Sequence, residues 1–419
     1  MGMLSHLTAL LRRRADGVDL ASPAFKVDPF PFYARLRDEA PVSRVALSSG
    51  IRPWLVTRYD DVALVLRDER FVKDMAKAVA PGAAPPLPPI PTMFKPLSHH
   101  MLNADPPDHT RLRALVSRAF TPTLVEGMRG RVQVIADGLL DGIAGRTRWD
   151  LIRDYALPIP TTVIAEMLGV PAEDRHRFHR WSRALLQSAG SRWAVWKAFP
   201  AVWQFLRYIR RLIEVRRAAP RDDLVSALIK AEEAGDRLSG DELVAMVFLL
   251  LVAGHETTVN LIGNGTLALL EHPEQMARLR AEPGLIRPAV EELLRFTSPV
   301  ETSTRRFARE DVTISGVTIS RGDVVLAVIA SANRDGRQFA DPDKLDVARE
   351  PNRHLSFGLG PHYCLGAPLA RLEGQIAIQT LLRRARGLRL DVPPNRVRWR
   401  GGLVVRGLES LPVAVDGWA

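Results

Sequence analysis

The stretch FGLGPHYCLG, residues 357–366, holds the single cysteine of this 419-residue chain. Cys364 has no intramolecular disulfide partner, so its thiol is either a small buried apolar group or a reactive or metal-binding group. The sequence that follows has helical periodicity, which places Cys364 just before a helix N-terminus, where amide groups and the helix dipole favour a thiolate. Gly358, Gly360 and Gly366 let the backbone pass close to the sulfur and to whatever it binds.

Two kinds of site compete for this thiol. A structural zinc site is disfavoured, because such sites combine several Cys or His ligands at set spacings. A catalytic Cys–His pair would use His362 or His354, yet no hydrolase signature accompanies the cysteine. Phe357 is placed to cover one side of whatever the sulfur binds.

A second chemically unusual stretch is AGHETT, residues 253–258. We expect one helix from Ser239 to Glu271, capped by Ser239 with Glu242 reaching back, and apolar nearly all round. A carboxylate and two hydroxyls in such a helix need partners or a purpose. A threonine hydroxyl can bond the carbonyl one turn back, and a glycine leaves room beside the backbone. The alternatives are a groove with a proton-delivery pair, or a helix kink with satisfied hydroxyls.

The sequence EELLRF contains an acid and a base on one helix face. Glu292 and Arg295 have i,i+3 spacing, which is usual for solvated ion pairs. If the pair is buried, it needs further donors and acceptors. Arg349 is the expected third member, and the network would then brace the cysteine loop.

The elements that position these residues are mostly helical. Hydrophobic periodicity predicts helices over 106–119, 123–144, 158–168, 172–188 and 193–218. Short strands are expected at 43–47 and 54–58, with a hairpin inside 303–332. The proline-rich segment 79–96 is expected to be a loop on the substrate side. The predicted fold class is mainly α with small β-sheets, in one unit spanning 1–419.

Composition narrows the cellular setting. Apolar residues make up 46% of the chain and charged residues 25%, which is ordinary for a globular protein. One cysteine suggests a reducing compartment, and the first residues lack a secretory pattern. The longest apolar stretch, 243–254, is well short of the ~20 residues that span a bilayer. Despite a net charge of +11, no nucleic-acid-binding signature is present. We expect a cytoplasmic protein without a membrane span.

Taken together, the motifs resemble those of a bacterial cytochrome P450, a thiolate-ligated haem monooxygenase. The acid–alcohol stretch, the ExxR of Glu292 and Arg295, the meander before PNRH and the cysteine loop occur in the family's order and spacing. The resemblance runs from DPFPFYARLRDEAPV to the C-terminus, and it is greatest to soluble hydroxylases of secondary metabolism, including macrolide hydroxylases. It implies the cytochrome P450 fold, with haem b between the long central helix and the cysteine loop.

The resemblance assigns roles to the chemically unusual residues. Cys364 matches the axial ligand, whose thiolate pushes electron density onto the iron. Thr257 matches the alcohol that holds dioxygen and its water. Glu256 matches the acid of the proton relay, where many relatives carry aspartate. Ala253 and Gly254 match the positions that line the oxygen groove.

Haem propionates need cations, and four residues match the family's propionate binders. His109 and Arg113 lie on the helix after the proline-rich loop. Arg306 and His354 match the other two, and Arg305 is the rival to Arg306 because the alignment can slip by one residue there. Without the motif context, each arginine would be read as a solvated surface cation.

The substrate and partners follow less directly. Leu249, Val252, Val300 and Thr302 are the expected contacts of an apolar small molecule. Electrons would come from a ferredoxin and its reductase, because the chain is too short to add a reductase domain. Five arginines are expected near the proximal face, where the donor docks: Arg111, Arg118, Arg371, Arg383 and Arg384.

Three alternatives remain open at this point. One is a hydroperoxide-driven hydroxylase, although such relatives replace the acid–alcohol pair that is present here. Another is a haem protein that binds ligands or carries electrons without oxygenating. The third concerns the substrate, which could arrive tethered to an acidic carrier protein.

Overall fold

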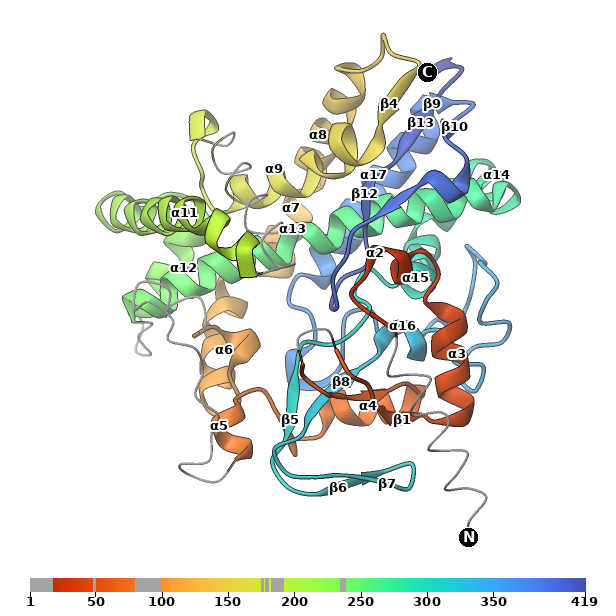
Figure 1. Cartoon of the computed structure of the whole chain (residues 1–419). Helices are drawn as coiled ribbons and strands as arrows, with labels where there is room; N and C mark the ends of the chain where they lie inside the picture. Colours follow the sequence, from red (N-terminus) through yellow and green to blue (C-terminus); the bar gives the residue numbers. More distant parts are fainter. Residues whose placement is uncertain are drawn as a thin grey trace. The chain divides into compact units, whose positions relative to one another are not determined.

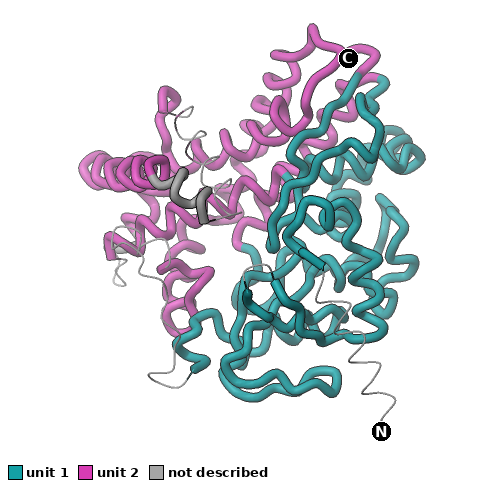
Figure 2. Tube along the Cα trace, in the orientation of Figure 1, with its two compact units in different colours: residues 1–85, 260–364, 387–414 teal, residues 86–259, 365–386, 415–419 magenta. Residues whose placement is uncertain are grey.

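The computed structural model describes residues 18–47, 50–79, 99–174, 192–233 and 239–419, together with Arg177 and Trp181; for 192–199 and 231–233 it describes the backbone alone. The chain divides into two compact units, each built from three stretches (Figure 2). Unit 1 comprises Met1–Pro85, Asn260–Cys364 and Gly387–Ala414, and unit 2 comprises Pro86–Val259, Leu365–Arg386 and Val415–Ala419. The single domain expected from the sequence stays a prediction.

Unit 1 contains a five-stranded sheet in the order β1–β2–β8–β5–β3. Strands β2 and β8 are parallel, and the other neighbours are antiparallel. Apolar side chains from these strands pack into one core with helix α4. The strands are β1 (Val42–Arg44), β2 (Trp54–Val56), β3 (Phe71–Val72), β5 (Arg306–Ala308) and β8 (Val324–Ala327).

The expected hairpin is confirmed between β5 and β8. Strands β6 (Val312–Ile314) and β7 (Val317–Ile319) pair antiparallel. Their turn has positive φ at both Ser315 (47°) and Gly316 (77°), the geometry that matches the twist of a two-residue hairpin.

The helices of unit 1 can be followed in Figure 1. They are α2 (Pro23–Val27), α3 (Phe30–Glu39), α4 (Tyr59–Arg67), α5 (Met75–Ala78), α14 (Pro273–Ala281), α15 (Ile286–Thr297) and α16 (Ile329–Ala332). The described part of the unit also contains two strand pairs, β10 (Arg389–Leu390) with β13 (Pro412–Ala414) and β11 (Arg398–Trp399) with β12 (Leu408–Ser410).

Unit 2 is almost entirely helical. Helix α17 packs against α8 and α7, α12 packs against α6 and α11, and α9 packs against α8. The helices are α6 (Asp108–Ala119), α7 (Pro122–Gly127), α8 (Arg129–Asp141), α9 (Pro158–Met167), α11 (Arg192–Ala218), α12 (Leu224–Glu233) and α17 (Ala367–Arg384). The strands are β4 (Arg148–Asp150), β9 (Ala385–Arg386) and β14 (Gly417–Trp418), of which β9 and β14 pair.

The long helix is α13 (Gly240–Glu271). The predicted capping box is confirmed, because the Ser239 amide donates to the Glu242 carboxylate over 2.7 Å and the Glu242 amide donates to the Ser239 hydroxyl over 3.1 Å. By length and composition α13 could cross a membrane, but 61% of its apolar window is buried within the protein. It is therefore better explained as a core helix.

The other sequence-based expectations fared unevenly. The predicted helix over 123–144 was wrong as one element, because it divides at Met128 into α7 and α8 and stops at Asp141. Gly127 ends the first piece, as expected for a residue of low helix propensity. The proline-rich segment 79–96 and the helix over 172–188 lie almost wholly outside the described residues.

Candidate functional site

Cys364 is held in a loop of unit 1 that closes on its own backbone. The Cys364 amide donates to the Phe357 carbonyl over 2.9 Å, and the Gly358 amide donates to the Leu355 carbonyl over 2.8 Å. The cysteine itself is exposed, so it is not the buried apolar group that was one of the sequence-based alternatives. The loop thus presents the sulfur rather than burying it.

Gly360 is required by two separate features of this loop. Its φ is +73°, and a Cβ added there would lie 3.0 Å from both the Cα of Arg67 and the carbonyl oxygen of Leu66. Gly358 shares the left-handed conformation, with φ of +71°, but its nearest neighbour would be the His362 carbonyl oxygen at 3.7 Å. Of the two, only Gly360 therefore lies in close contact with the end of α4.

Phe357 and Gly366 are the other two loop residues with a predicted cofactor contact. The ring of Phe357 lies 6.0 Å from that of His354 and 6.4 Å from that of Tyr363, measured between centroids. Gly366 caps α17 with φ of −79° and ψ of 5°, a conformation open to other residues. Their predicted cofactor contacts stay predictions.

The acid–base pair of α15 is buried and shared. Arg295 donates to both oxygens of Glu292, over 2.7 and 2.8 Å. The Arg349 Nε lies 3.1 Å from each of the same oxygens. The Asn352 amide group and the Asp346 backbone amide complete the set. A buried ion pair needs such further partners, and the structure brings together the three residues that the sequence named.

Asn333 connects this network to the cysteine loop, a role that the sequence did not reveal. The Arg295 guanidinium donates to the Asn333 carbonyl over 2.9 Å. The Asn333 side chain in turn accepts from the Leu355 amide over 2.8 Å and donates to the Ser356 hydroxyl over 2.9 Å. Asn333 is fully buried. No periodicity or motif marks it, because its partners are distant in sequence.

His354 is occupied within unit 1. Its Nε2 lies 3.1 Å from a Glu291 carboxylate oxygen, and its Nδ1 accepts from the Ser356 amide over 3.2 Å. These contacts assign the hydrogen to Nε2, which donates to Glu291. Both ring nitrogens are thus engaged within the protein, and the propionate contact expected for His354 stays a prediction.

Arg305 and Arg306, at the start of β5, differ in burial. Arg306 is buried, and its guanidinium donates to the carbonyls of Phe71 and Leu66 over 3.2 Å each. Arg305 is exposed, and its carbonyl accepts from the Lys73 ammonium over 3.1 Å. Arg305 lies just before β5, which begins at Arg306, and of the two arginines Arg306 is the buried one. Its propionate contact stays a prediction.

His109 and Arg113 lie on α6 in unit 2. They are four positions apart and so share one face of the helix. His109 is buried and Arg113 is half-buried. That common face is what a pair of propionate-binding cations would need, and the role itself stays a prediction.

The AGHETT stretch interrupts the burial of α13. Leu251, His255 and Thr258 are buried, whereas Ala253 is exposed in the middle of this apolar helix. The Thr257 hydroxyl donates to the Ala253 carbonyl over 3.1 Å, as the sequence suggested. The half-buried residues beside Ala253 are Val252, Gly254, Glu256 and Thr257. One face of α13 is thus left uncovered where the acid and the alcohol lie.

The expected substrate contacts divide into open and closed positions. Leu249 is buried on α13, and Val300 is half-buried and bridges to Val405. Thr302 is fully buried, and its hydroxyl donates to the Leu403 carbonyl over 2.9 Å. Its hydroxyl is therefore engaged within the protein, and the substrate contact expected for Thr302 stays a prediction.

The segment next to Val300 and Thr302 is fixed by a buried charge. The Glu301 carboxylate accepts from the Lys26 ammonium over 2.7 Å and from the Tyr33 hydroxyl. Burial is the main reason that the pKa of Tyr33 is raised well above its usual range. The segment around Glu301 is therefore fixed by buried contacts with Lys26 and Tyr33.

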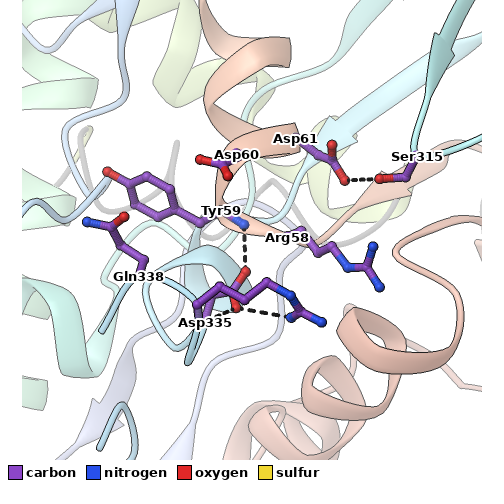
Figure 3. A pocket seen from close by; sticks show the side chains of 8 residues that line it. Arg58, Tyr59, Asp60, Asp61, Ser315, Asp335 and Gln338 are labelled. Carbon is purple, nitrogen blue, oxygen red and sulfur yellow. Dashed lines mark hydrogen bonds and ion pairs between the residues drawn. The ribbon is translucent and has the colours of Figure 1, made fainter. Parts of the chain in front are cut away.

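A separate surface cavity of about 260 Å³ opens in unit 1 beside the start of α4 (Figure 3). Asp335 accepts there from the Tyr59 and Arg337 amides over 2.9 and 3.0 Å, and Asp61 accepts from the Ser315 hydroxyl over 2.6 Å. The lining is polar and includes none of the residues predicted for the site. We do not place an apolar substrate in it.

Comparison with known proteins decides the family. The family model described as Cytochrome P450 matches residues 54–405. This chain belongs to the cytochrome P450 family. Members of this family are haem-thiolate oxidoreductases that bind haem b. This chain is therefore a haem b oxidoreductase, and the family predicted from the sequence motifs is confirmed.

Three relatives place this cytochrome P450 more closely. It is 46% identical over 396 residues to the polyketide biosynthesis cytochrome P450 PksS of Bacillus subtilis, covering 94% of this chain and 97% of PksS. It is 44% identical over 415 residues to the cytochrome P450 monooxygenase PikC of Streptomyces venezuelae, covering 96% of this chain and 97% of PikC. The predicted mainly helical cytochrome P450 fold is confirmed by the solved structure of PksS, with a TM-score of 0.87 over 95% of this chain and 99% of that one.

A third relative was solved with a carrier protein. The structure of P450BioI, in complex with an acyl carrier protein that bears hexadec-9Z-enoic acid, matches with a TM-score of 0.85 and 41% identity. The match covers 94% of this chain and 100% of that one.

The described residues fit a haem group. In unit 1 the exposed sulfur of Cys364 stands in a tight glycine-shaped loop, which suits a thiolate ligand. In unit 2 an exposed alanine interrupts a buried apolar helix beside a carboxylate and a hydroxyl. Small residues and an uncovered backbone are what a flat macrocycle requires of its surroundings, so neither unit argues against the group.

Proposed function

We propose that this cytochrome P450 hydroxylates an apolar secondary metabolite of the macrolide or polyketide kind in the cytoplasm. The observation that carries the proposal is the pairing of Glu256 with Thr257 on the uncovered face of α13. PksS and PikC, whose names point to polyketide biosynthesis and monooxygenation, support the substrate class.

Each named residue has a distinct task in this proposal. Haem b, held through the Cys364 thiolate, supplies the activation of dioxygen. The Thr257 hydroxyl, which donates its hydrogen to the Ala253 carbonyl, offers its oxygen as a positioned acceptor for the water that accompanies dioxygen. The half-buried Glu256 carboxylate delivers protons from solvent. Apolar Leu249 and Val252 keep other water away from the reacting carbon.

Electrons arrive singly from a ferredoxin and its reductase. Of the five arginines expected to receive the donor, three pair with acids of unit 2. Arg111 pairs with Glu242, Arg383 with Asp137 and Arg384 with Asp141. These pairs weaken the positive field at those positions, so the exposed Arg118 is a more effective contact for an acidic donor than these three. The docking role expected for Arg371 stays a prediction.

The test combines spectra with turnover. The purified haem-loaded protein is screened with macrolides, polyketides, sterols and fatty acids for the spectral shift that follows displacement of the iron-bound water. Compounds that shift the spectrum are then incubated with NADPH and a surrogate ferredoxin system. We expect a hydroxylated macrolide or polyketide, and oxidation of fatty acids alone would contradict the substrate class.

A carrier-bound substrate is the second form considered, because P450BioI was solved with an acyl carrier protein. The net charge of +11 is compatible with an acidic carrier. Comparing free and carrier-tethered versions of one polyketide in the same assay separates the two forms. Turnover with hydrogen peroxide alone, at the rate seen with NADPH, would instead favour the peroxide-driven alternative.

A further inference from the structure

Glu373 is a buried carboxyl group in unit 2 that the proposed chemistry does not use. It lies on α17 and is 1% exposed. The Thr258 hydroxyl of α13 is hydrogen-bonded to it. Thr258 is itself 2% exposed. A glutamate among the mostly apolar buried residues of α17 is a signal that the sequence already contains.

The second oxygen of this carboxyl has no partner. Glu373 Oε2 is buried without a hydrogen bond among the residues that the structure describes. An ionised carboxylate in such a position would be strongly disfavoured. Burial accordingly raises the pKa of Glu373 to about 8, and the hydrogen bond from Thr258 offsets only part of that rise. The group is therefore a neutral acid at neutral pH.

Among the residues that the structure describes, no charge on the helices packed against α17 compensates Glu373. Burial and Thr258 are the two influences on its pKa. The acids on those helices are paired elsewhere: Asp137 and Asp141 of α8 with Arg383 and Arg384, Glu126 of α7 with Arg129, and Glu166 of α9 with Arg131. The contact with Thr258 is thus neutral on both sides.

The position of Thr258 gives this contact a consequence. Thr258 directly follows Glu256 and Thr257, but each residue of a helix is rotated by about 100° from the last. Its side chain is buried where theirs are half-buried. A hydrogen bond at Thr258 therefore opposes rotation of the helix turn that carries the acid and the alcohol.

We propose that Glu373 is a positioning residue, whose buried carboxyl holds Thr258 and thereby fixes the orientation of Glu256 and Thr257 on α13. The inference rests on the proposed function for the roles of Glu256 and Thr257. The contact itself, and its effect on α13, can be measured without any substrate.

The experiment uses three variants of the haem-loaded protein. Glu373→Gln keeps a neutral hydrogen-bonding group of the same shape, Glu373→Leu removes the hydrogen bond but fills the space, and Thr258→Val removes the partner hydroxyl. Thr380→Val is the matched control. Thr380 is a buried threonine on α17, the helix that carries Glu373, and its hydroxyl accepts from Gln133 over 2.9 Å. Each protein is examined by amide hydrogen exchange of residues 253–260, by product formed per NADPH, and by stability against pH.

The proposal predicts a specific pattern. Glu373→Leu and Thr258→Val speed exchange in residues 253–260 and lower the product per NADPH roughly fivefold, the size expected from one lost buried hydrogen bond. Haem content and the reduced-CO band are unchanged. Glu373→Gln retains coupling and exchange protection. Thr380→Val lowers stability without altering coupling.

The pH series gives a readout that simple packing would not move. The folded carboxyl keeps its proton up to about pH 8, whereas the unfolded one loses it near its ordinary pKa of 4.5. Stability is therefore highest below the lower value, falls as pH rises between the two, and levels off above the higher one. Glu373→Gln should abolish that fall.

Two results would overturn the inference. One is a Glu373→Gln protein that retains the wild-type fall in stability with pH. The other is a Thr258→Val protein with wild-type exchange and coupling, which remains informative even if Glu373→Leu fails to fold. If the wild-type protein oxidised nothing, the proposed function would fail, while exchange and pH measurements would still judge Glu373.

Discussion

Glu292 and Arg295, on one face of α15, meet through two N–H···O bonds of 2.7 and 2.8 Å with both side chains fully excluded from solvent. The same spacing on an exposed helix would give a weak surface pair. Here Arg349 and Asn333 extend the pair to the residues that precede the cysteine loop. The contribution of this buried pair to stability depends on every donor and acceptor in it having a hydrogen-bond partner, and not on the two charges alone.

Replacing Glu292 by alanine should be severe. It would leave Arg295 buried without its counter-charge, a loss of about 3–5 kcal/mol in the free energy of unfolding. We also expect poor haem incorporation, because the loop would lose its support. Denaturant unfolding and the haem-to-protein absorbance ratio check this prediction.

Lys344→Ala is the matched control for Glu292. Lys344 forms an exposed pair with Asp341 at the same spacing, so we expect a change of only about 0–1 kcal/mol. Equal losses in the two variants would contradict the importance assigned to burial.

Gly360→Ala should destabilise the cysteine loop more than Gly358→Ala. Both substitutions put a Cβ on a left-handed residue, which costs about 1–2 kcal/mol. Only the Gly360 variant also drives that Cβ to within 3.0 Å of backbone atoms of α4. Comparing the two variants by thermal unfolding and haem retention isolates the steric contribution, and identical behaviour would argue against it.

Cys364→His should remove the red-shifted reduced-CO band, because a nitrogen ligand lacks the electron donation of a thiolate. Haem can still bind, so the pyridine haemochrome assay serves as the control for cofactor content. If the band persisted in this variant, Cys364 would not be the ligand.

Thr257→Ala should keep haem but uncouple oxygen use. The variant loses the hydroxyl that donates to the Ala253 carbonyl. Water and protons would then no longer be positioned at the dioxygen site, and more of the oxygen would be released as peroxide. Peroxide and product are measured against NADPH consumed. Thr266→Val, which removes a buried hydroxyl from the same helix, is the control, and fully coupled turnover by the Thr257 variant would refute the assignment.

Reversing the charge at Arg118 should slow reduction by ferredoxin roughly tenfold at low salt and flatten its dependence on ionic strength. Stopped-flow reduction under CO measures the rate. Arg396→Glu, an exposed cation of unit 1, should leave it unchanged. Unaltered reduction kinetics in the Arg118 variant would exclude this residue from docking.

Much of the framework could be predicted from the sequence, because its determinants are close together along the chain. The capping box of Ser239 and Glu242, the turn at Ser315 and Gly316, and the extent of α13 depend on neighbours within a few residues. The spacing of the motifs around Glu256, Glu292 and Cys364 was enough to indicate the family.

Tertiary structure decided what each side chain touches. Asn333 links the Glu292 network to the cysteine loop, and His354 is hydrogen-bonded to Glu291. The Thr302 hydroxyl donates to the Leu403 carbonyl, and Glu373 is hydrogen-bonded to Thr258. Periodicity specifies which face of a helix is buried, but not which distant atom meets it there. Burial and partner together set the charge of Glu373 and the strength of the Glu292–Arg295 pair, and both arise only when separated segments pack.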